Sequence, residues 1–432
     1  MDLSRYRKRI SESSALSVEG RITASAGPAL RAVIPHTRIG DAVELHPSQG
    51  EPLLCEVVAF DEDGVTLLPL GPTTGVAPGD LVRSVGHSLK IQCSDALLGR
   101  VLDGVGQSMD AKGEIDGSPW DVMRPPPDPL KRKRVDQVLS TGIRAIDGLL
   151  CLGYGQRMGV FAGSGAGKSY LLGQIARGAD ADVVVVCLVG ERGREVREFL
   201  EDCLGDEGQK KSVVVCATSD APALVRLKSA YTATAIAEWF RDQGKRVLLL
   251  MDSVTRFARA AREVGLAAGE PPARRGYPPS VFAALPSLME RSGQGEQGSI
   301  SAIYTVLVEG DDFDEPIADE VRGILDGHIV LDRHIGMRGR FPAIDPLASL
   351  SRVMDSLVEE KHRLAAGRLR EFISVYESNR DLVSLGAYKA GSNLLLDDAL
   401  YRLKHIENFL RQRPDEHASF EQTVEALLEL VH

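Results

Sequence analysis

A glycine-rich turn that ends in Gly167-Lys168-Ser169 stands between an apolar run and an apolar-periodic segment. The stretch MGVFAGSGAGKSYLLGQI, residues 158–175, therefore predicts a strand, a loop and a helix in that order. This arrangement places backbone N–H groups and a positive helix terminus around one anion, and Lys168 adds a full charge for the β- and γ-phosphates of a nucleotide. Ser169 is then the expected Mg²⁺ ligand. The other predicted phosphate-binding residues are Gly163, Ser164, Gly165, Ala166, Gly167 and Tyr170.

One position departs from the phosphate-loop pattern GxxxxGK[ST]. The pattern begins with glycine, where this chain has Ala162 followed by Gly163 and Gly165. The alternative is an ordinary glycine-rich turn without a ligand. The intact Gly-Lys-Ser, the strand before it and the helix after it favour the phosphate-binding interpretation.

Two further apolar runs end in carboxylates. The run VLLLMD ends in Asp252, which matches the second signature of phosphate-loop proteins, a carboxylate that holds Mg²⁺ through water. A helix N-cap is the alternative for Asp252. The run VVVVCLVGERGREV ends its strand at Glu191, where a carboxylate beside the γ-phosphate can orient and deprotonate water. Arg192 follows directly; surface charge at a helix start is the alternative, and it suits Arg194 and Glu195 better than Glu191.

Composition narrows the class of protein. The chain has 432 residues, so two or three domains are expected. Its net charge of -10 argues against a protein that coats nucleic acid by bulk charge. The six cysteines are scattered without a CxxC pair, which predicts buried free thiols in a reducing compartment, the cytosol. The start MDLSRYRKRISES has no apolar segment after it and no run suffices to span a membrane, so membrane contact is expected to be peripheral.

Three domains are expected, at residues 1–87, 88–350 and 351–432. From about Leu16 to Val85 short β-type runs alternate with turns, which predicts a β-barrel or sandwich with a hairpin turn at Asp61 to Gly64. Residues 86–129 form a connection rich in glycine and proline. The run Lys131 to Arg134 could contact lipid or nucleic acid, but a solvated charged face is the commoner outcome.

The middle of the chain predicts a parallel sheet buried on both faces, because near-continuous apolar runs alternate with helical stretches. Such a sheet binds ligands beyond the carboxyl ends of its strands, where the loop at Gly163 lies. From about Asp355 onward amphipathic helices are expected, including Glu359–Tyr376 and Leu395–Leu410, with Phe409 and Leu410 in the core. The predicted strands are Met158–Phe161, Val183–Val189, Val213–Ala217, Val247–Met251, Ile300–Val308 and His328–Leu331.

Eight stretches in family order, spread over residues 140–393, resemble the catalytic subunits of rotary ATP synthases, and most closely the type III secretion and flagellar protein export ATPases. The sequence of the stretch DEPIADEVRGILDGHIVLDR is similar to that of the export ATPases. The resemblance implies an α/β protein with an N-terminal β-barrel, a central RecA-like parallel-sheet nucleotide-binding domain and a C-terminal helical domain. The matching stretches are STGIRAIDGLL, AGSGAGKS, GERGREV, LLLMDSVTRFARAAREV, GYPPSVFAALPSLMERSG, DEPIADEVRGILDGHIVLDR, FPAIDPLASLSRVM and GAYKAGSN.

The resemblance also implies roles for single residues, with ATP and Mg²⁺ as cofactors. Lys168 would bind the phosphates, Ser169 and Asp252 the Mg²⁺, and Glu191 would be the catalytic carboxylate with Arg192 nearby. Arg352 would be an arginine finger offered to a neighbouring subunit; an ordinary ion pair is its alternative. Phe341 stands where the family often has a tyrosine against the adenine, and a core phenylalanine is its alternative. Asp332 replaces a more usual serine.

The expected function is that of a homohexameric Mg²⁺-dependent ATPase at the cytoplasmic face of the inner membrane. The resemblance implies that it releases chaperones from exported proteins and unfolds them, with stator and central-stalk proteins and chaperone–effector complexes as partners. A flagellar rather than injectisome system is the nearest alternative; the short extension before the barrel and the wording EVRGILDGH favour the injectisome.

Two other classes are weaker. A nucleic-acid motor would need a basic, aromatic barrel face, but Phe60 is the only aromatic residue between Leu16 and Val85. Nucleic acid is therefore not an expected partner. A non-catalytic nucleotide-holding ring subunit conflicts with the presence of both Lys168 and Glu191.

Overall fold

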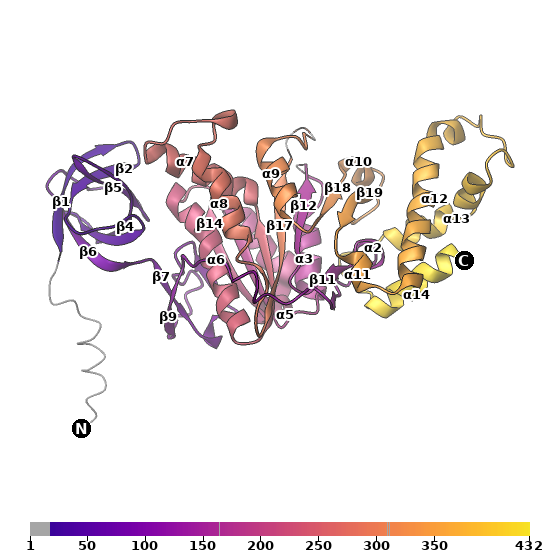
Figure 1. Ribbon diagram of the computed structural model, residues 1–432, viewed down its shortest axis with the longest axis horizontal. Coiled ribbons are helices and arrows are strands. Elements are labelled where there is room, and N and C mark those ends of the chain that lie inside the picture. Colours follow the sequence, from indigo (N-terminus) through magenta and orange to yellow (C-terminus); the bar gives the residue numbers. More distant parts are fainter. Residues whose placement is uncertain (1–17, 164, 309, 311) are drawn as a thin grey trace, which may run out of the picture.

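Three regions follow one another along the molecule: a barrel, a sheet covered by helices, and a helical end (Figure 1). The computed structural model describes residues 18–163, 165–308, 310 and 312–432. The predictions for the N-terminal start at 1–17 and for Ser164 lie outside the described residues.

In the described part of the chain, strands β1 to β6 close into a barrel in the order β1-β2-β5-β4-β3-β6, which confirms the predicted barrel. Its interior is filled by Val43, Leu45, Val57 and Leu67, all with no exposed surface. The predicted hairpin is also confirmed, because β4 and β5 pair up to Asp61 and Gly64. The strands are β1 Glu19–Ala26, β2 Ala29–Val33, β3 Asp41–His46, β4 Leu53–Asp61, β5 Gly64–Pro69 and β6 Leu81–Ser88.

The segment predicted as a plain connection contains strands, and this is a correction. β7 (Lys90–Cys93) pairs with β9 (Ser118–Asp121), while β8 (Val101–Asp103) extends the central sheet beside β14 (Ser212–Thr218). A strand of three residues between glycine turns has no readable periodicity, so its partner strand decides its conformation. A short 3₁₀ turn, Asp95–Leu97, precedes β8.

The charged run after the connection is not uniformly solvated. Arg132 donates to the backbone oxygen of Ser292 at 2.9 Å, and only 18% of its side chain is exposed. Lys131 pairs at 3.3 Å with Glu296. The prediction of a solvated face therefore fails for Arg132, which ties this segment to the nucleotide domain.

The central sheet has the order β19-β18-β12-β17-β15-β13-β14-β8. Its strands run parallel except β19, which is antiparallel to β18 at the edge, and β16, which pairs antiparallel with β17 off this path. All six predicted strands are present. Their bounds are β12 Arg157–Ala162, β13 Val183–Glu191, β14 Ser212–Thr218, β15 Arg246–Asp252, β17 Ser299–Leu307 and β18 Gly327–Leu331, with β16 Gly293–Gln294 and β19 Ile344–Ser351.

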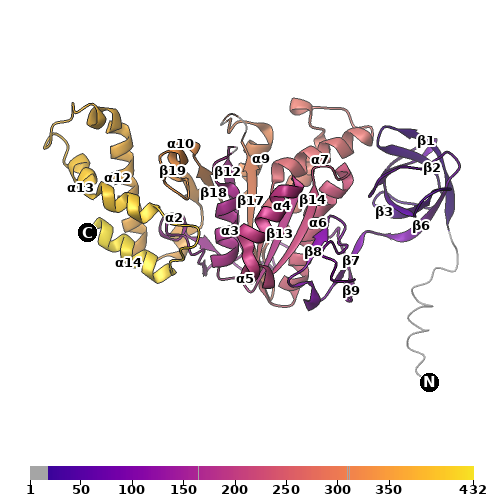
Figure 2. The same cartoon turned by 180° about the vertical axis from the view of Figure 1, so that it is seen from behind.

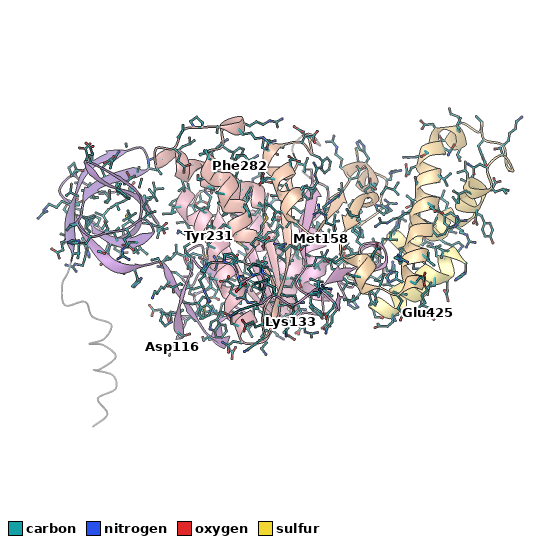
Figure 3. The ribbon with its side chains drawn as sticks, viewed as in Figure 1. Asp116, Lys133, Met158, Tyr231, Phe282 and Glu425 are labelled. Atoms are coloured by element: carbon teal, nitrogen blue, oxygen red, sulfur yellow. The ribbon has the colours of Figure 1, made fainter. Side chains whose placement is uncertain are left out.

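Helices cover both faces of this sheet, α6, α8 and α9 in Figure 1 and α3, α4 and α5 in Figure 2. Successive strand residues alternate between two cores: Val184 and Val186 belong to one, Val183 and Val185 to the other. Met158 on β12 and Tyr231 on α6, labelled in Figure 3, lie in opposite cores. The helices are α2 Arg144–Leu149, α3 Lys168–Gly178, α4 Gly193–Glu198, a π-helix Phe199–Leu204, α5 Gly205–Lys210, α6 Ala223–Asp242, α7 Val254–Ala267, α8 Pro279–Met289, α9 Pro316–Ile324 and α10 Arg333–Met337.

The C-terminal part is helical, as expected, with Phe409 and Leu410 buried. It contains α11 Met354–Leu357, α12 Glu360–Ser384, α13 Leu394–Leu410 and α14 Phe420–Val431. Since β6 ends at Ser88 and β19 at Ser351, we propose 87/88 and 350/351 as the domain boundaries. Among the described residues, none of the helices has the length and apolar character needed to cross a membrane. Two minor pairs and a turn complete the elements: β10 Val138–Leu139, β11 Leu152–Gly153 and the 3₁₀ turn Arg274–Gly276.

Candidate active site

The glycine-rich loop connects β12 directly to α3, as the sequence predicts. Gly165 and Gly167 have φ values of 78° and 84°, a region that glycine enters without steric cost. Ala162, which departs from the motif, is the last residue of β12 and is 1% exposed. Ala162 therefore belongs to the strand rather than to the turn. In a strand, alanine adopts the backbone conformation without strain.

Three predicted residues converge at the edge of the central sheet where its parallel strands end. The ammonium group of Lys168 forms an ion pair with Asp252 at the end of β15, and lies 4.0 Å from Oε1 of Glu191 at the end of β13. Their side chains are 13%, 4% and 8% exposed, respectively. The low exposure strengthens the electrostatic interactions, so a phosphate entering here would meet a poorly screened charge.

Glu191 is held from its other side by Arg256 on α7, at 2.8 Å from Oε2. Burial, a hydrogen bond with Glu195 and the nearby Asp252 charge raise the pKa of Glu191 to about 8, against the opposing effect of Lys168 and Arg256. A carboxylate whose pKa lies near neutrality is suited to accept a proton from water. The position of Glu191 thus fits a general base, while its raised pKa means that the carboxyl group must lose its own proton before it can accept one.

Asp252 receives a second contact from the strand between β12 and β15. Thr305 on β17, fully buried, donates from Oγ1 to Oδ1 of Asp252 at 2.8 Å. The N-cap alternative for Asp252 is wrong, because Ser253 caps α7 by accepting from the backbone N–H of Arg256. Asp252 is therefore not used as a helix cap, and its Oδ1 instead contacts Lys168 and Thr305.

The residues present fit a magnesium ion. Mg²⁺ prefers oxygen ligands and keeps several waters, so one carboxylate and one hydroxyl are enough beside the phosphates. Asp252 and the exposed Ser169 provide these groups. The described residues contain no cluster of three or more His, Cys, Asp or Glu that would hold a metal by itself.

A cleft of about 870 Å³ lies over the phosphate loop and Glu191, and Asp252 and Phe341 are not among its lining residues. Its outer wall includes Phe199 and Cys203 of the π-helix, which the sequence did not suggest. Arg192 lies at the rim with its side chain 78% exposed and paired with Glu195 at 3.1 Å. The predicted residues that line the cleft are Gly163, Gly165, Gly167, Lys168, Ser169, Tyr170, Glu191 and Arg192.

Phe341 lies beside the phosphate loop, in the segment between α10 and β19. A Cβ atom placed on Gly167 would lie 3.6 Å from Cε1 of its ring. The residue is 46% exposed, whereas the core phenylalanines Phe161 and Phe257 are 1% and 0% exposed. The ring therefore offers an open aromatic face next to the site of the phosphates.

Arg352 is not brought into this cleft. It is exposed between β19 and α11, where its backbone N–H donates to the oxygen of Asp326 at 3.0 Å. Its side chain has no acidic partner within ion-pair distance among the described residues. Asp332, which the sequence left without an interpretation, caps α10 by accepting from the N–H of His334 at 2.6 Å.

Comparison with known proteins gives matches along the whole architecture. The family model of the ATP synthase alpha/beta nucleotide-binding domain matches residues 142–351, its beta-barrel domain residues 22–86, and the EscN-type ATPase C-terminal domain of type III secretion residues 358–429. A flagellum-specific ATP synthase of Bacillus subtilis (strain 168) is 50% identical over 95% of this chain and 94% of its own length. A type 3 secretion system ATPase of Xanthomonas euvesicatoria is 50% identical over 94% and 93%. The chain belongs to the ATP synthase alpha/beta family.

Within that family it is an ATPase of the branch that contains the type III secretion and flagellar export ATPases. A solved structure of the assembled ATPase EscN from the enteropathogenic E. coli type III secretion system has a TM-score of 0.91 and 49% identity, over 96% of this chain and 100% of that one. EscN in complex with its central stalk EscO has a TM-score of 0.89 at the same identity and the same coverage. The predicted family and three-part fold are confirmed.

Sequence reasoning on this ATPase missed two residues that hold the predicted ones. Arg256 lies one helical turn after Asp252, in VTRFAR, and its position at a helix start beside two strand-end carboxylates was the available signal. Thr305 had none, because a threonine inside an apolar strand is an ordinary core residue. Only the strand order β12-β17-β15 places its hydroxyl on Asp252.

Proposed function

We propose that this chain hydrolyses ATP with Mg²⁺ to drive protein export by a type III secretion apparatus. The observation that carries the proposal is the convergence of Glu191 and Asp252, at the ends of two neighbouring strands, with Lys168 at the start of α3. The arrangement combines the cation Lys168 with two carboxylates that have different partners: Glu191 pairs with Arg256, and Asp252 contacts Thr305. Those are the groups that water attack on a γ-phosphate requires.

Each side chain has a separate task. Lys168 binds the β- and γ-phosphates, while Asp252 and Ser169 would hold Mg²⁺, which when bound neutralises charge on the phosphates. Glu191 orients water and accepts its proton at a carboxylate oxygen, with Arg256 fixing the other oxygen. Arg192 at the rim supports the transferring phosphoryl group, and Phe341 stacks on the adenine.

The active form is a homohexamer in which Arg352 of one subunit completes the site of the next. Its exposed position, without an acidic partner in the described chain, supports this assignment. An arginine finger stabilises charge that develops in the transition state. The related EscN is solved in an assembled form and with its central stalk, which supports a ring and a stalk partner here.

The working site in the cell is the cytoplasmic face of the inner membrane, in peripheral contact with the export machinery. There the ATPase would bind stator and central-stalk proteins, release chaperones from effectors and unfold the cargo. Nucleic acid is not among the proposed partners, in keeping with the net charge of -10. We favour the injectisome; a flagellar export role is the alternative, supported by the flagellum-specific relative at 50% identity.

Two measurements test the proposal. ATP-driven release of an effector from its chaperone, assayed with complexes from the same host, should occur with the wild-type chain and fail with Glu191→Gln. Deleting the gene should stop effector secretion and leave flagellar filaments intact. Loss of filaments with normal effector secretion would establish the flagellar alternative, and release by Glu191→Gln at the wild-type rate would contradict the catalytic assignment.

A further inference from the structure

The segment between α13 and α14, residues 411–419, is largely exposed, but it contacts the nucleotide domain through backbone oxygens and through the buried Gln412. Gln174 of α3 donates to the backbone oxygens of Arg413 at 3.1 Å and Glu416 at 3.4 Å. Arg177 of the same helix donates to the oxygen of Pro414 at 2.8 Å. We call residues 411–419 the α13–α14 connector. It links the C-terminal helices to the helix that begins at the phosphate loop.

Gln412 is the most deeply embedded point of this contact, with an exposed fraction of 3%. Its Oε1 accepts from the backbone N–H of Arg144 at 2.8 Å. Its Nε2 donates to the backbone oxygens of Gly142 at 2.7 Å and Glu416 at 3.0 Å. The amide is therefore bound on both sides to backbone groups, and it has no donor left with which to contact a ligand.

The backbone of Gln412 is thereby fixed, and it holds Phe341. The N–H of Gln412 donates to the backbone oxygen of Phe341 at 2.8 Å. The preceding residue, Arg340, adds a hydrogen bond to the oxygen of Ile344 at 3.2 Å and a longer contact of 3.5 Å to Glu407 on α13. The aromatic ring beside Gly167 thus depends on the C-terminal region for its backbone position.

We propose that Gln412 is a positioning residue for the ring of Phe341, so that a side chain of the C-terminal region sets the affinity for the base of the nucleotide. The inference rests on the proposed function, in which Phe341 stacks on adenine. Stacking depends on the orientation of the ring relative to the base. A connector that shifts would therefore weaken the hold on the base without changing the hold on the phosphates.

The test compares two glutamine-to-methionine variants of similar volume. Gln412→Met removes the three side-chain hydrogen bonds that fix the connector at Phe341. Gln174→Met is the matched control, because Gln174 is 8% exposed and contacts the same connector but not Phe341. The probes are AMP-PNP, which carries the base, and inorganic triphosphate, which does not; both affinities are measured by calorimetry with Mg²⁺.

The expected result for Gln412→Met is AMP-PNP binding weakened about threefold, the size of one lost hydrogen bond, with triphosphate binding unchanged. In steady state KM for ATP should rise and kcat should stay constant. Gln174→Met should leave the ratio of the two affinities unchanged. In a Phe341→Ala background the effect of Gln412→Met on AMP-PNP should disappear, since the residue acts through the ring.

The other outcomes separate two failures. If Phe341→Ala alone leaves the affinity ratio unchanged, the stacking part of the proposed function is wrong and the inference falls with it. Suppose that Phe341→Ala lowers the affinity for AMP-PNP relative to that for triphosphate. Gln412 is then not a positioning residue if Gln412→Met leaves this ratio unchanged, or if Gln412→Met lowers it by the same factor in the Phe341→Ala background as in the wild type. Equal weakening of AMP-PNP and triphosphate would assign Gln412 a purely structural role.

Discussion

The phosphate end of the cleft and the loop at Phe341, the proposed base end, are built in opposite ways. Glu191 and Asp252 are buried at the ends of sheet strands, and Lys168, the first residue of α3, has a side chain that is 13% exposed. Phe341 is 46% exposed, lies in a loop, and is held by a backbone hydrogen bond from residue 412. Charge chemistry needs a dry and rigid surrounding, because Coulomb interactions weaken in water. Stacking needs an open ring face, which a loop can present.

This difference predicts unequal responses to substitution. A change at the phosphate end should affect turnover steeply, because the groups there act on the transition state. A change at the base end should alter affinity modestly and leave kcat intact. The four predictions below test this contrast, from the largest expected effect to the smallest.

Arg352→Ala should lower hydrolysis by a factor of about 10³ to 10⁵, the range of an arginine finger. It would show that the phosphate end is incomplete within one chain. Mixed rings of Arg352→Ala and Lys168→Ala chains should regain activity, since some interfaces pair an intact finger with an intact loop. Arg363→Ala, which removes an exposed arginine paired with Glu360 at 3.8 Å, is the control. No recovery in demonstrably mixed rings would contradict an interface role.

Glu191→Gln should reduce turnover by about 10² to 10⁴ and keep ATP affinity within a few-fold, because a general base acts after capture. Steady-state hydrolysis and calorimetric binding measure the two effects. Glu198→Gln is the control, since Glu198 lines the same cleft but pairs with Arg194 at 2.8 Å. Wild-type turnover in Glu191→Gln would remove it from the catalytic groups.

Thr305→Val should raise the Mg²⁺ concentration needed for AMP-PNP binding by about tenfold, a usual effect of losing a hydrogen bond to a metal-binding carboxylate. The change keeps the volume and removes only the hydroxyl on Asp252. Titration of Mg²⁺ in a binding assay measures it. Thr305→Ser retains the hydroxyl and should behave like the wild type; an unchanged Mg²⁺ requirement in the valine variant would contradict the role of Thr305.

Phe341→Ala should weaken ATP binding by ~1 kcal/mol, with little change in melting temperature, because the ring is half exposed. Affinity and thermal unfolding without nucleotide are the two measurements. Phe341→Tyr keeps the stacking face and should preserve affinity. Emptying a core site would instead cost ~3 to 5 kcal/mol of stability. A large drop in melting temperature with unchanged affinity would therefore disprove stacking.

Local patterns predicted the phosphate end well. The strands that carry Glu191 and Asp252 are continuous apolar runs, and a parallel sheet places their carboxyl ends at one edge. The loop at Gly163 is recognisable from the consecutive glycine, lysine and serine at its end. Each of these signals lies within a few residues of the group it positions, so one sequence is enough to find it.

The supports of the site were not predictable in the same way. Gln412 and Phe341 are far apart along the chain, and neither local sequence predicts contact with the other. β8 and β19 are edge strands. β8 has three residues and β19 contains Pro346, so pairing with the neighbouring strand, rather than the local sequence, determines their extended conformation. The resemblance to a family predicts that Phe341 lies near the base. It could not show which backbone group holds it.

The six cysteines of this ATPase are expected to react slowly with thiol reagents. All six are buried, and burial raises the pKa of four of their thiols to about 12, so almost no reactive thiolate is present near neutral pH. Tyr401 on α13, by contrast, is 82% exposed. A fluorescent maleimide should therefore label Tyr401→Cys much faster than the buried natural thiols, of which only Cys203 lines the cleft, and would follow the C-terminal helices during turnover.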